Sequence, residues 1–295
     1  MVPAYRPNEK CFRQSLESVL EQAPGEGQMQ IEVVDDCSPD VDVAAMTRLI
    51  GGERVSFSST SKNLGLAGCW NACIEHSRGQ WVHILHQDDY VLPGFYARLA
   101  RAAQQHPEVN LLATRSFYVD PDGVIIEASV RLRRLENGGR FVDDFFYATP
   151  IQCPGIAIKR SFYEAHGGFR ADLAFTLDCE MWTRVISAGG GLVTPEVLSC
   201  YRMSDTNETG RLSRTAEDAR DLTRLNDLFA AQHSTFDSKA ARERACYMAI
   251  RNANRLSAMG DAEGAKANRD FWRNNAPPLL RLRLLAVTVA RKIFG

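Results

Sequence analysis

Two adjacent acids, Asp88 and Asp89, end an apolar run in the stretch LHQDDYVLPG, residues 85–94, and a turn follows them directly. Their like charges repel each other at the end of a buried strand. A divalent cation relieves this repulsion, because Mg²⁺ or Mn²⁺ is typically held by one or two carboxylates while substrate phosphates fill its other positions. The pair therefore predicts a station for a metal ion and a diphosphate, with a plain solvated loop as the alternative.

A second acidic pair, Asp35 and Asp36, ends another apolar run, IEVV at residues 31–34. In open α/β sheets, ligands bind beyond the carboxyl ends of the strands. Two strand ends that finish in adjacent acids therefore favour a shared site over two unrelated surface loops.

The pattern of the first half predicts the elements that must carry these acids. Short β-rich runs at residues 31–34, 54–59 and 81–85 alternate with segments of helical period, which is typical of a parallel, doubly wound sheet. Asn8 is placed to cap the first helix. Because only Met1 and Val2 precede the first loop, PAYRPNE, we expect the first strand to be cut short.

Further along, a hairpin is predicted where residues 110–120 and 123–129 flank the turn residues Pro121 and Asp122. From about Thr215 the pattern becomes purely helical. We therefore expect an α/β domain with a mixed, mostly parallel sheet flanked by helices, followed by a helical appendage.

Composition limits the partners. The chain of 295 residues is 45% hydrophobic, enough for a substantial core, and its 35 basic and 36 acidic residues argue against a nucleic-acid partner. Its eight cysteines show no repeated CxxC spacing, so we interpret them as reduced. We see no signal peptide and no apolar run of about 20 residues, and therefore predict a cytoplasmic protein.

Six segments together carry a resemblance to a known family: PAYRPNE, SLESVLEQ, EVVDDCSPD, NLGLAGCWN, LHQDDYVLPG and GGFRADLAFTLDCEMWTRV. Their order over residues 1 to about 205 is similar to that of family 2 glycosyltransferases. The resemblance implies the GT-A fold and an inverting transfer of a sugar from a nucleotide diphosphate donor, usually a UDP-sugar, helped by Mn²⁺ or Mg²⁺. We expect the glycosyltransferase domain at residues 1–212 and a helical extension at 213–295.

For the donor base, the resemblance implies that Pro3, Ala4 and Tyr5 form the loop that packs on it and that Asp35 or Asp36 reads it. Spacing does not choose between the two acids. An ordinary loop aromatic and a pair of turn formers are the alternatives for Tyr5 and the acids.

In NLGLAGCWN, the resemblance implies that Asn63 and Gly65 lie on a donor-side loop and that Asn71 lies on the following helix. Without it, a plain turn explains Asn63 and Gly65. The family often has Arg where this chain has Trp70, so a direct charge contact from that position is not expected.

At LHQDD, the resemblance implies that Asp89 is the principal metal ligand and that Asp88 supports the nucleotide ribose or the water shell of the metal. The family commonly has an acid where His86 stands. Three alternatives remain for His86: a weak ligand, a hydrogen-bond donor to the diphosphate, or a neutral loop histidine.

The resemblance places the general base for inversion at Asp178, after the acceptor loop GGFRADLAF. Leu177 stands where an acid often precedes this base in the family, and a helix cap or first-turn acid is the structural alternative. Glu180 is four residues before Arg184, so a surface pair explains it, although an acceptor or diphosphate contact stays open. Trp182 has the spacing of a core face, with an acceptor contact as the minority interpretation.

Beyond the base, the segment YRMSDTNET is similar to the one where many family members place a histidine near the metal. Here that position is Ser204, so Arg202 or Arg211 is a candidate to neutralise the leaving diphosphate instead. Either can equally be an ordinary surface arginine.

The tail, residues 277–295, alternates apolar residues with basic ones and carries no acid. Peripheral contact with an anionic membrane near a lipid-linked acceptor, at the inner face, is one interpretation, and a final packed helix is the other. Polysaccharide or glycolipid synthesis by hexosyl or N-acetylhexosaminyl transfer is the leading function. A non-catalytic sugar-nucleotide binder and a nucleotidyltransferase are the alternatives, although no glycine-rich phosphate loop is present.

Overall fold

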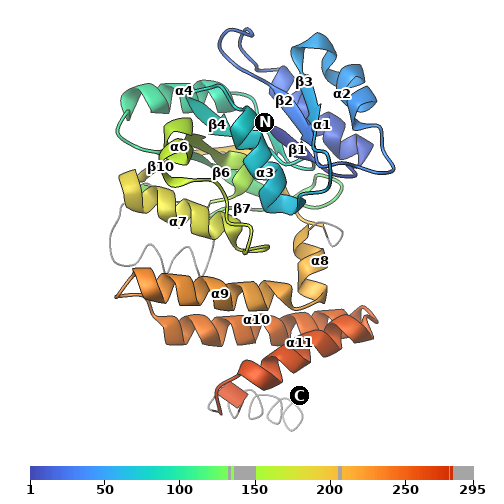
Figure 1. The fold of residues 1–295 in the computed structure, drawn as a ribbon, viewed down its shortest axis with the longest axis vertical. Helices are drawn as coiled ribbons and strands as arrows, with labels where there is room; N and C mark the ends of the chain where they lie inside the picture. The colour runs from blue at the N-terminus through green and yellow to red at the C-terminus, as the bar shows by residue number, and fades with distance from the viewer. Residues whose placement is uncertain (132–133, 136–150, 205–207, 279, 282–295) are drawn as a thin grey trace. The chain divides into compact units, whose positions relative to one another are not determined.

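The computed structural model describes residues 1–131, 134–135, 151–204, 208–278 and 280–281 (Figure 1). The chain divides into two compact units. The first comprises Met1–Asp172 and Leu177–Ser204, and the second comprises Leu173–Thr176 and Asp205–Gly295. The domain boundary predicted at residue 212 stays a prediction.

A parallel sheet of three strands, in the order β1-β2-β3, opens the first unit. Its strands are β1 (Val2–Ala4), β2 (Glu32–Asp35) and β3 (Ser56–Ser59). Asn8 caps α1 (Glu9–Leu20), as predicted, by accepting a hydrogen bond from the Cys11 amide. Helix α1 buries Phe12, Leu16 and Val19 in a core shared with Val33, so the register of the sheet is fixed by one apolar face.

A larger mixed sheet follows, with strand order β4-β9-β6-β10-β5 and with β7 and β8 paired to β6 and β10. The long strands β6 and β10 run parallel, and each remaining pairing described for this sheet is antiparallel. The predicted hairpin is present as β6 and β7. The bounds are β4 (Trp81–His83), β5 (Tyr90–Val91), β6 (Leu111–Val119), β7 (Ile125–Ala128), β8 (Arg134–Leu135), β9 (Ile156–Lys159) and β10 (Gly191–Arg202).

The start of the chain joins the two sheets. The amino group of Met1 donates to the carbonyl of His83, and the Leu85 amide donates back to the carbonyl of Met1. The loop after the short strand β1 is thereby set beside the loop after β4. The remaining helices in the described part of the first unit are α2 (Val43–Gly51), α3 (Gly65–His76), α4 (Phe95–Gln105), α6 (Arg160–His166) and α7 (Leu177–Gly189), with short 3₁₀ turns at Gly52–Arg54 and Cys153–Gly155.

The described part of the second unit is helical apart from its segment Leu173–Thr176. In Figure 1, α9 and α10 lie side by side, and α11 packs against α10. Asp237 and Asp261 cap α10 and α11 through their carboxylates, and the predicted apolar positions Leu222, Leu225 and Phe229 are buried. The bounds are α8 (Glu208–Arg214), α9 (Glu217–Gln232), α10 (Ser238–Ala258) and α11 (Ala262–Asn275).

All eight cysteines are free, and six of them are buried. None of the helices in the described part of the chain combines the length and the apolar character that a bilayer crossing needs.

Candidate active site

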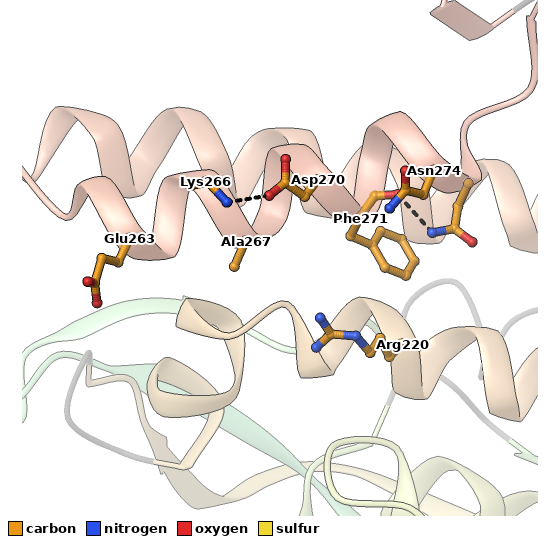
Figure 2. A pocket seen from close by; sticks show the side chains of 8 residues that line it. Arg220, Glu263, Lys266, Ala267, Asp270, Phe271 and Asn274 are labelled. Atoms are coloured by element: carbon orange, nitrogen blue, oxygen red, sulfur yellow. Dashed lines mark hydrogen bonds and ion pairs between the residues drawn. The ribbon is translucent and has the colours of Figure 1, made fainter.

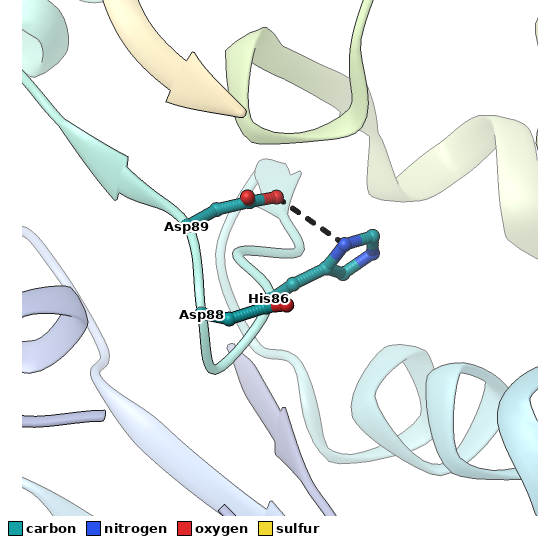
Figure 3. A group of neighbouring side chains, drawn as sticks. All are labelled: His86, Asp88 and Asp89. Carbon is teal, nitrogen blue, oxygen red and sulfur yellow. Dashed lines mark ion pairs between the residues drawn. The ribbon is translucent and has the colours of Figure 1, made fainter. Parts of the chain in front are cut away.

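The stretch His86–Asp89 forms a tight turn between β4 and β5, in which the Asp89 amide donates to the His86 carbonyl at 3.2 Å. This turn brings the side chains of His86, Asp88 and Asp89 together, and one ligand atom from each lies within 4.8 Å of the others (Figure 3). Gln87 faces elsewhere, because its amide exchanges two hydrogen bonds with the backbone of Tyr5, at 2.8 and 3.1 Å. The turn therefore separates three candidate metal ligands from one structural amide.

Asp89 has one committed and one open oxygen. Its side chain is 1% exposed, and its Oδ1 accepts a hydrogen bond from the Arg202 amide at 2.8 Å. Among the described residues Oδ2 accepts no hydrogen bond, and it faces Nδ1 of His86 at 3.4 Å. A buried carboxylate oxygen without a hydrogen-bond donor is costly unless a cation binds it, so the residues present fit a metal ion.

The electrostatic cost of placing two acids side by side is visible at Asp88. Burial, and then the charge of Asp89, raises the pKa of Asp88 to about 6. For His86, burial opposes the charged ring, but the Cys153 sulfur and Asp89 outweigh it and raise the pKa well above its usual value. Ionisation of both carboxylates in this turn is unfavourable, and a divalent cation would stabilise their charges.

Arg202 holds this turn through hydrogen bonds to its backbone and to neighbouring loops. It is 4% exposed, and its guanidinium donates to the carbonyls of Asp88, Asp120 and Pro121 and to Oε1 of Gln14. Because the guanidinium already donates to these protein acceptors, the structure favours an anchoring role for Arg202 over the predicted contact with a diphosphate.

Arg211 and Ser204 are the other candidates from that stretch. Arg211 is an exposed residue of α8 in the second unit and pairs with Glu208. Ser204 is half-buried at the end of a described stretch.

The acids after β2 are both engaged. The carboxylate of Asp36 accepts hydrogen bonds from the amides of Leu64 and Gly65, at 2.7 and 2.9 Å, at the start of α3. Asp35 accepts from the amide and hydroxyl of Ser38 and from the hydroxyl of Ser59. Asp36 therefore holds the loop that leads into α3, whereas the partners of Asp35 are mainly hydroxyl groups that can turn to other acceptors.

The predicted base-binding loop presents one side chain. Pro3 and Ala4 are buried within β1, while Tyr5 is 40% exposed. Asn63 is exposed and donates to the carbonyl of Asp36 at 3.3 Å. Gly65 has φ +72, a left-handed conformation that explains the glycine there.

Helix α3 is tied to the loop GGF, residues 167–169. The side-chain amide of Asn71 donates to the Phe169 carbonyl at 2.9 Å and accepts from its amide at 2.7 Å. A Cβ atom at Gly168 would lie 2.1 Å from Oδ1 of Asn71, so only glycine fits. Arg184 donates to the carbonyls of residues 166, 167 and 168.

Glu180 forms the predicted pair with Arg184, at 2.9 Å, but the pair is not a surface pair, since Glu180 is 8% exposed. The carboxylate orients the arginine that holds the GGF turn. Trp182 is buried, as its core spacing predicts.

A row of rings connects these parts. Trp70 stacks on His86 with centroids 4.8 Å apart, Phe169 meets Trp70 edge-on at 4.8 Å, and Trp182 meets Phe169 at 6.0 Å. Trp70, at a position where the family often has Arg, thus contacts His86, at a position where the family commonly has an acid.

Asp178 lies in the first turn of α7, and its Oδ1 accepts a hydrogen bond from the Cys179 amide at 2.7 Å. Burial raises the pKa of this carboxyl group, and the charge of His86 partly opposes the rise. Burial likewise raises the pKa of Cys153; His86 lowers it, and the charges of Asp178 and Asp89 raise it further. The charge of His86 therefore acts on both Asp178 and Cys153, and these residues belong to the same compact unit.

The model of the family "Glycosyl transferase family 2" matches residues 1–167, which is more than half of the chain. This range includes Tyr5 after β1, the acids at the end of β2 and the turn at residues 86–89. This chain is a family 2 glycosyltransferase.

Relatives of the transferase are distant. An uncharacterized protein of Mycobacterium tuberculosis is 27% identical over 239 residues, 76% of this chain and 72% of that protein. An uncharacterized glycosyltransferase of Methanocaldococcus jannaschii is 21% identical over 127 residues, 43% of this chain and 44% of that protein.

Solved structures show the same fold. Residues 1–349 of S. aureus TarS, in complex with UDP-GlcNAc, match with a TM-score of 0.59 and 15% identity, over 92% of this chain and 90% of that one. A mannosyltransferase of Pyrobaculum calidifontis, in complex with GDP-Man and Mn²⁺, matches with a TM-score of 0.59 and 17% identity, over 100% of this chain and 79% of that one. The GT-A fold that the sequence predicts is confirmed.

Sequence reasoning missed Gln87 and Cys153 at the site. In the helical unit it missed Asp221, whose Oδ2 accepts hydrogen bonds from the amides of Phe175 and Thr176. Gln87 and Cys153 carry no local signal, because their partners come from distant parts of the chain. Asp221 does carry one: it occupies the same helical stripe as Leu222 and Leu225, where an acid is unexpected.

The helical unit also contains an open pocket of about 530 Å³ that is lined partly by α11. Lys266 at its edge pairs with Asp270 at 2.9 Å (Figure 2), and Asp270 also pairs with Arg273. These charges are paired within the helix, so we consider the pocket a weaker candidate for a ligand site than the turn at residues 86–89, the HQDD turn.

Proposed function

We propose that this transferase moves a sugar from a nucleoside diphosphate donor, with UDP as the expected nucleotide, to a hydroxyl group of a glycan or lipid-linked acceptor, with inversion. One observation carries the proposal: in a chain of this family, ligand atoms of His86, Asp88 and Asp89 lie within 4.8 Å of one another, and Oδ2 of Asp89 accepts no hydrogen bond from any described residue. The ligands named for the two solved neighbours, UDP-GlcNAc and GDP-Man with Mn²⁺, support the donor class.

On the donor side, we assign Tyr5 to stack on the base and Asp35 to read it, because Asp36 is committed to α3. Asn63 and Gly65 line the donor loop. Asp89, with Asp88, holds Mn²⁺ or Mg²⁺; such an ion, when bound, stabilises the negative charge on the departing diphosphate.

On the acceptor side, Asp178 takes the proton of the attacking hydroxyl group. The oxygen of that hydroxyl bonds to the anomeric carbon while the bond from this carbon to the diphosphate breaks. A carboxylate with a raised pKa is a stronger base than an ordinary one. The GGF turn, held by Asn71 and Arg184, forms the wall beside the acceptor.

Sugar transfer from UDP-sugars, measured with and without Mn²⁺, tests this assignment. Asp178→Asn should lower kcat about 10²- to 10⁴-fold, the usual contribution of a general base, and leave UDP binding intact. Asp227→Asn, at an exposed acid of α9, is the matched control and should keep full activity.

Two outcomes would favour the other functions. Metal-dependent UDP binding without any turnover would indicate a sugar-nucleotide binder, and release of pyrophosphate in place of UDP would indicate a nucleotidyltransferase.

The division at residue 212, a role in polysaccharide synthesis at the cytoplasmic face and membrane contact by residues 277–295 are further proposals. Most of that tail lies outside the described residues. Flotation of the full chain with anionic liposomes, compared with a chain ending at Ala276, tests the contact, and equal flotation would contradict it.

A further inference from the structure

We propose that His86 is itself a metal ligand and that it makes this site select a first-row transition ion such as Mn²⁺ or Co²⁺ over Mg²⁺. The inference rests on the proposed function, since it concerns the metal of the same site. It goes further by naming a nitrogen ligand and the class of ion that this ligand favours.

The first argument is geometric. Ligands bound at about 2.1 Å can be at most about 4.2 Å apart across one ion, and neighbouring ligands are about 3 Å apart. Nδ1 of His86 and Oδ2 of Asp89 are 3.4 Å apart, and the ligand atoms of all three residues lie within 4.8 Å (Figure 3). Small side-chain rotations are enough to place the three around one ion.

The second argument is the open oxygen. Asp89 is 1% exposed, and its Oδ2 is aimed at the imidazole without accepting a hydrogen bond from any described residue. Nε2 of His86 likewise has no hydrogen-bond partner in the described structure. An ion between Oδ2 and the ring would satisfy the oxygen that the folded chain leaves open.

The third argument is that the ring is held in place. Trp70 stacks on it at 4.8 Å with an interplanar angle of 28°, and the hydroxyl of Ser15 donates to the His86 carbonyl at 3.1 Å. A fixed ligand loses little conformational freedom on binding an ion.

Ligand chemistry then sets the preference. Mg²⁺ favours oxygen ligands and near-ideal octahedral geometry, whereas imidazole favours the later first-row ions, whose affinities rise from Mn²⁺ through Co²⁺. Replacing one oxygen ligand by a ring nitrogen therefore weakens Mg²⁺ binding relative to Co²⁺ or Mn²⁺.

Titration of the full chain with Mn²⁺, followed by electron paramagnetic resonance with UDP present, measures this preference without any turnover. Competition by Co²⁺ and Mg²⁺ gives their relative affinities. We expect the ratio of Co²⁺ to Mg²⁺ affinity to fall roughly 10- to 100-fold in both His86→Gln and His86→Asp. The absorption bands of bound Co²⁺ should also shift in both variants.

His106→Gln is the matched control, because His106 also faces a carboxylate, that of Glu108 at 3.3 Å, but in an exposed pair. It should leave the ratio unchanged. Thermal unfolding of each variant shows whether it folds, and His86→Asp, which restores an all-oxygen ligand set, serves if His86→Gln unfolds.

An unchanged affinity ratio in folded His86 variants, or tighter Mn²⁺ binding by His86→Gln, would overturn the inference while leaving the proposed function intact. If the wild type binds no divalent ion even with UDP, the metal dependence in the proposed function fails as well.

Discussion

The residues of the HQDD turn carry opposing demands. Asp88 and Asp89 are close enough that burial and mutual repulsion raise the pKa of Asp88 to about 6. Such a pair destabilises the metal-free fold and prepares it for a cation. The acidic pair was predictable from the sequence as a candidate metal site, since two strand ends finish in acids. The role of the His86 imidazole was left open, because only the packing of Trp70 shows how the ring is held.

Replacing Asp88 by Asn should stabilise the metal-free protein at pH 7.5 by about 1–2 kcal/mol. The folded pKa lies above the ordinary value of 3.8, so wild-type stability falls as pH rises between roughly 4 and 6. The gain should therefore shrink to roughly half at pH 5, which lies midway through this range. Urea unfolding at both pH values measures it, and an equal gain at both would contradict the account.

The raised pKa of Asp178 predicts the pH dependence of transfer. The base works only when ionised, so kcat/KM should fall about tenfold per pH unit below a midpoint that lies above 3.8. Rates at saturating Mn²⁺ between pH 4.5 and 8 measure this limb. The residual activity of Asp178→Asn should lack this limb, and a variant that keeps the wild-type limb would contradict the role of Asp178 as the base.

At the scale of elements, local patterns predicted strands at residues 31–34, 54–59 and 81–85, but not how they pair. The third of these strands, β4, does not join the parallel sheet as expected and instead pairs antiparallel with β9 in the second sheet. Asn8 was recognisable as a cap because its partner, Cys11, is three residues away. Asn71 and Phe169 are 98 residues apart and bond twice, and no periodicity or turn signal connects them. The sequence could thus place the GGF loop on the acceptor side by resemblance, but it could not show what holds the loop.

Gly168→Ala should destabilise the protein by about 1–3 kcal/mol and lower transfer, because the new Cβ would lie 2.1 Å from Oδ1 of Asn71. That oxygen cannot withdraw without losing its bond to Phe169. Gly25→Ala, where nothing lies within 4 Å, is the control and should stay within about 0.5 kcal/mol of wild type. Thermal unfolding and activity together decide, and equal behaviour of the two variants would refute the tie.

In the helical unit, Asp221 is fully buried, and its Oδ2 accepts three hydrogen bonds from Phe175 and Thr176. Asp221→Asn should cost about 2–3 kcal/mol, since the new amide group would face donors and lose the charge paired with Arg224. The exposed control Asp227→Asn should cost less than about 0.5 kcal/mol. Urea unfolding compares them, and similar midpoints would show that Asp221 contributes little.

For the whole molecule, the family model covers residues 1–167, and solved GT-A structures match at least 92% of the chain in the two cases given above. Fold and family were therefore within reach of the sequence, because the order of six segments reflects one sheet topology. The donor sugar and the acceptor were not, since they depend on the shapes of loops.

A ligand that binds the folded state at 100 times its Kd adds about 2.7 kcal/mol, so UDP with Mn²⁺ should raise the melting temperature clearly more than either alone.

The most direct test of the central claim is a crystal structure of the transferase soaked with a UDP-sugar and Mn²⁺. The account predicts Mn²⁺ within roughly 2.2 Å of Oδ2 of Asp89, bound to both phosphates, with the anomeric carbon of the sugar facing Asp178. A diphosphate bound away from Asp89, or a sugar whose anomeric carbon faces away from Asp178, would contradict it.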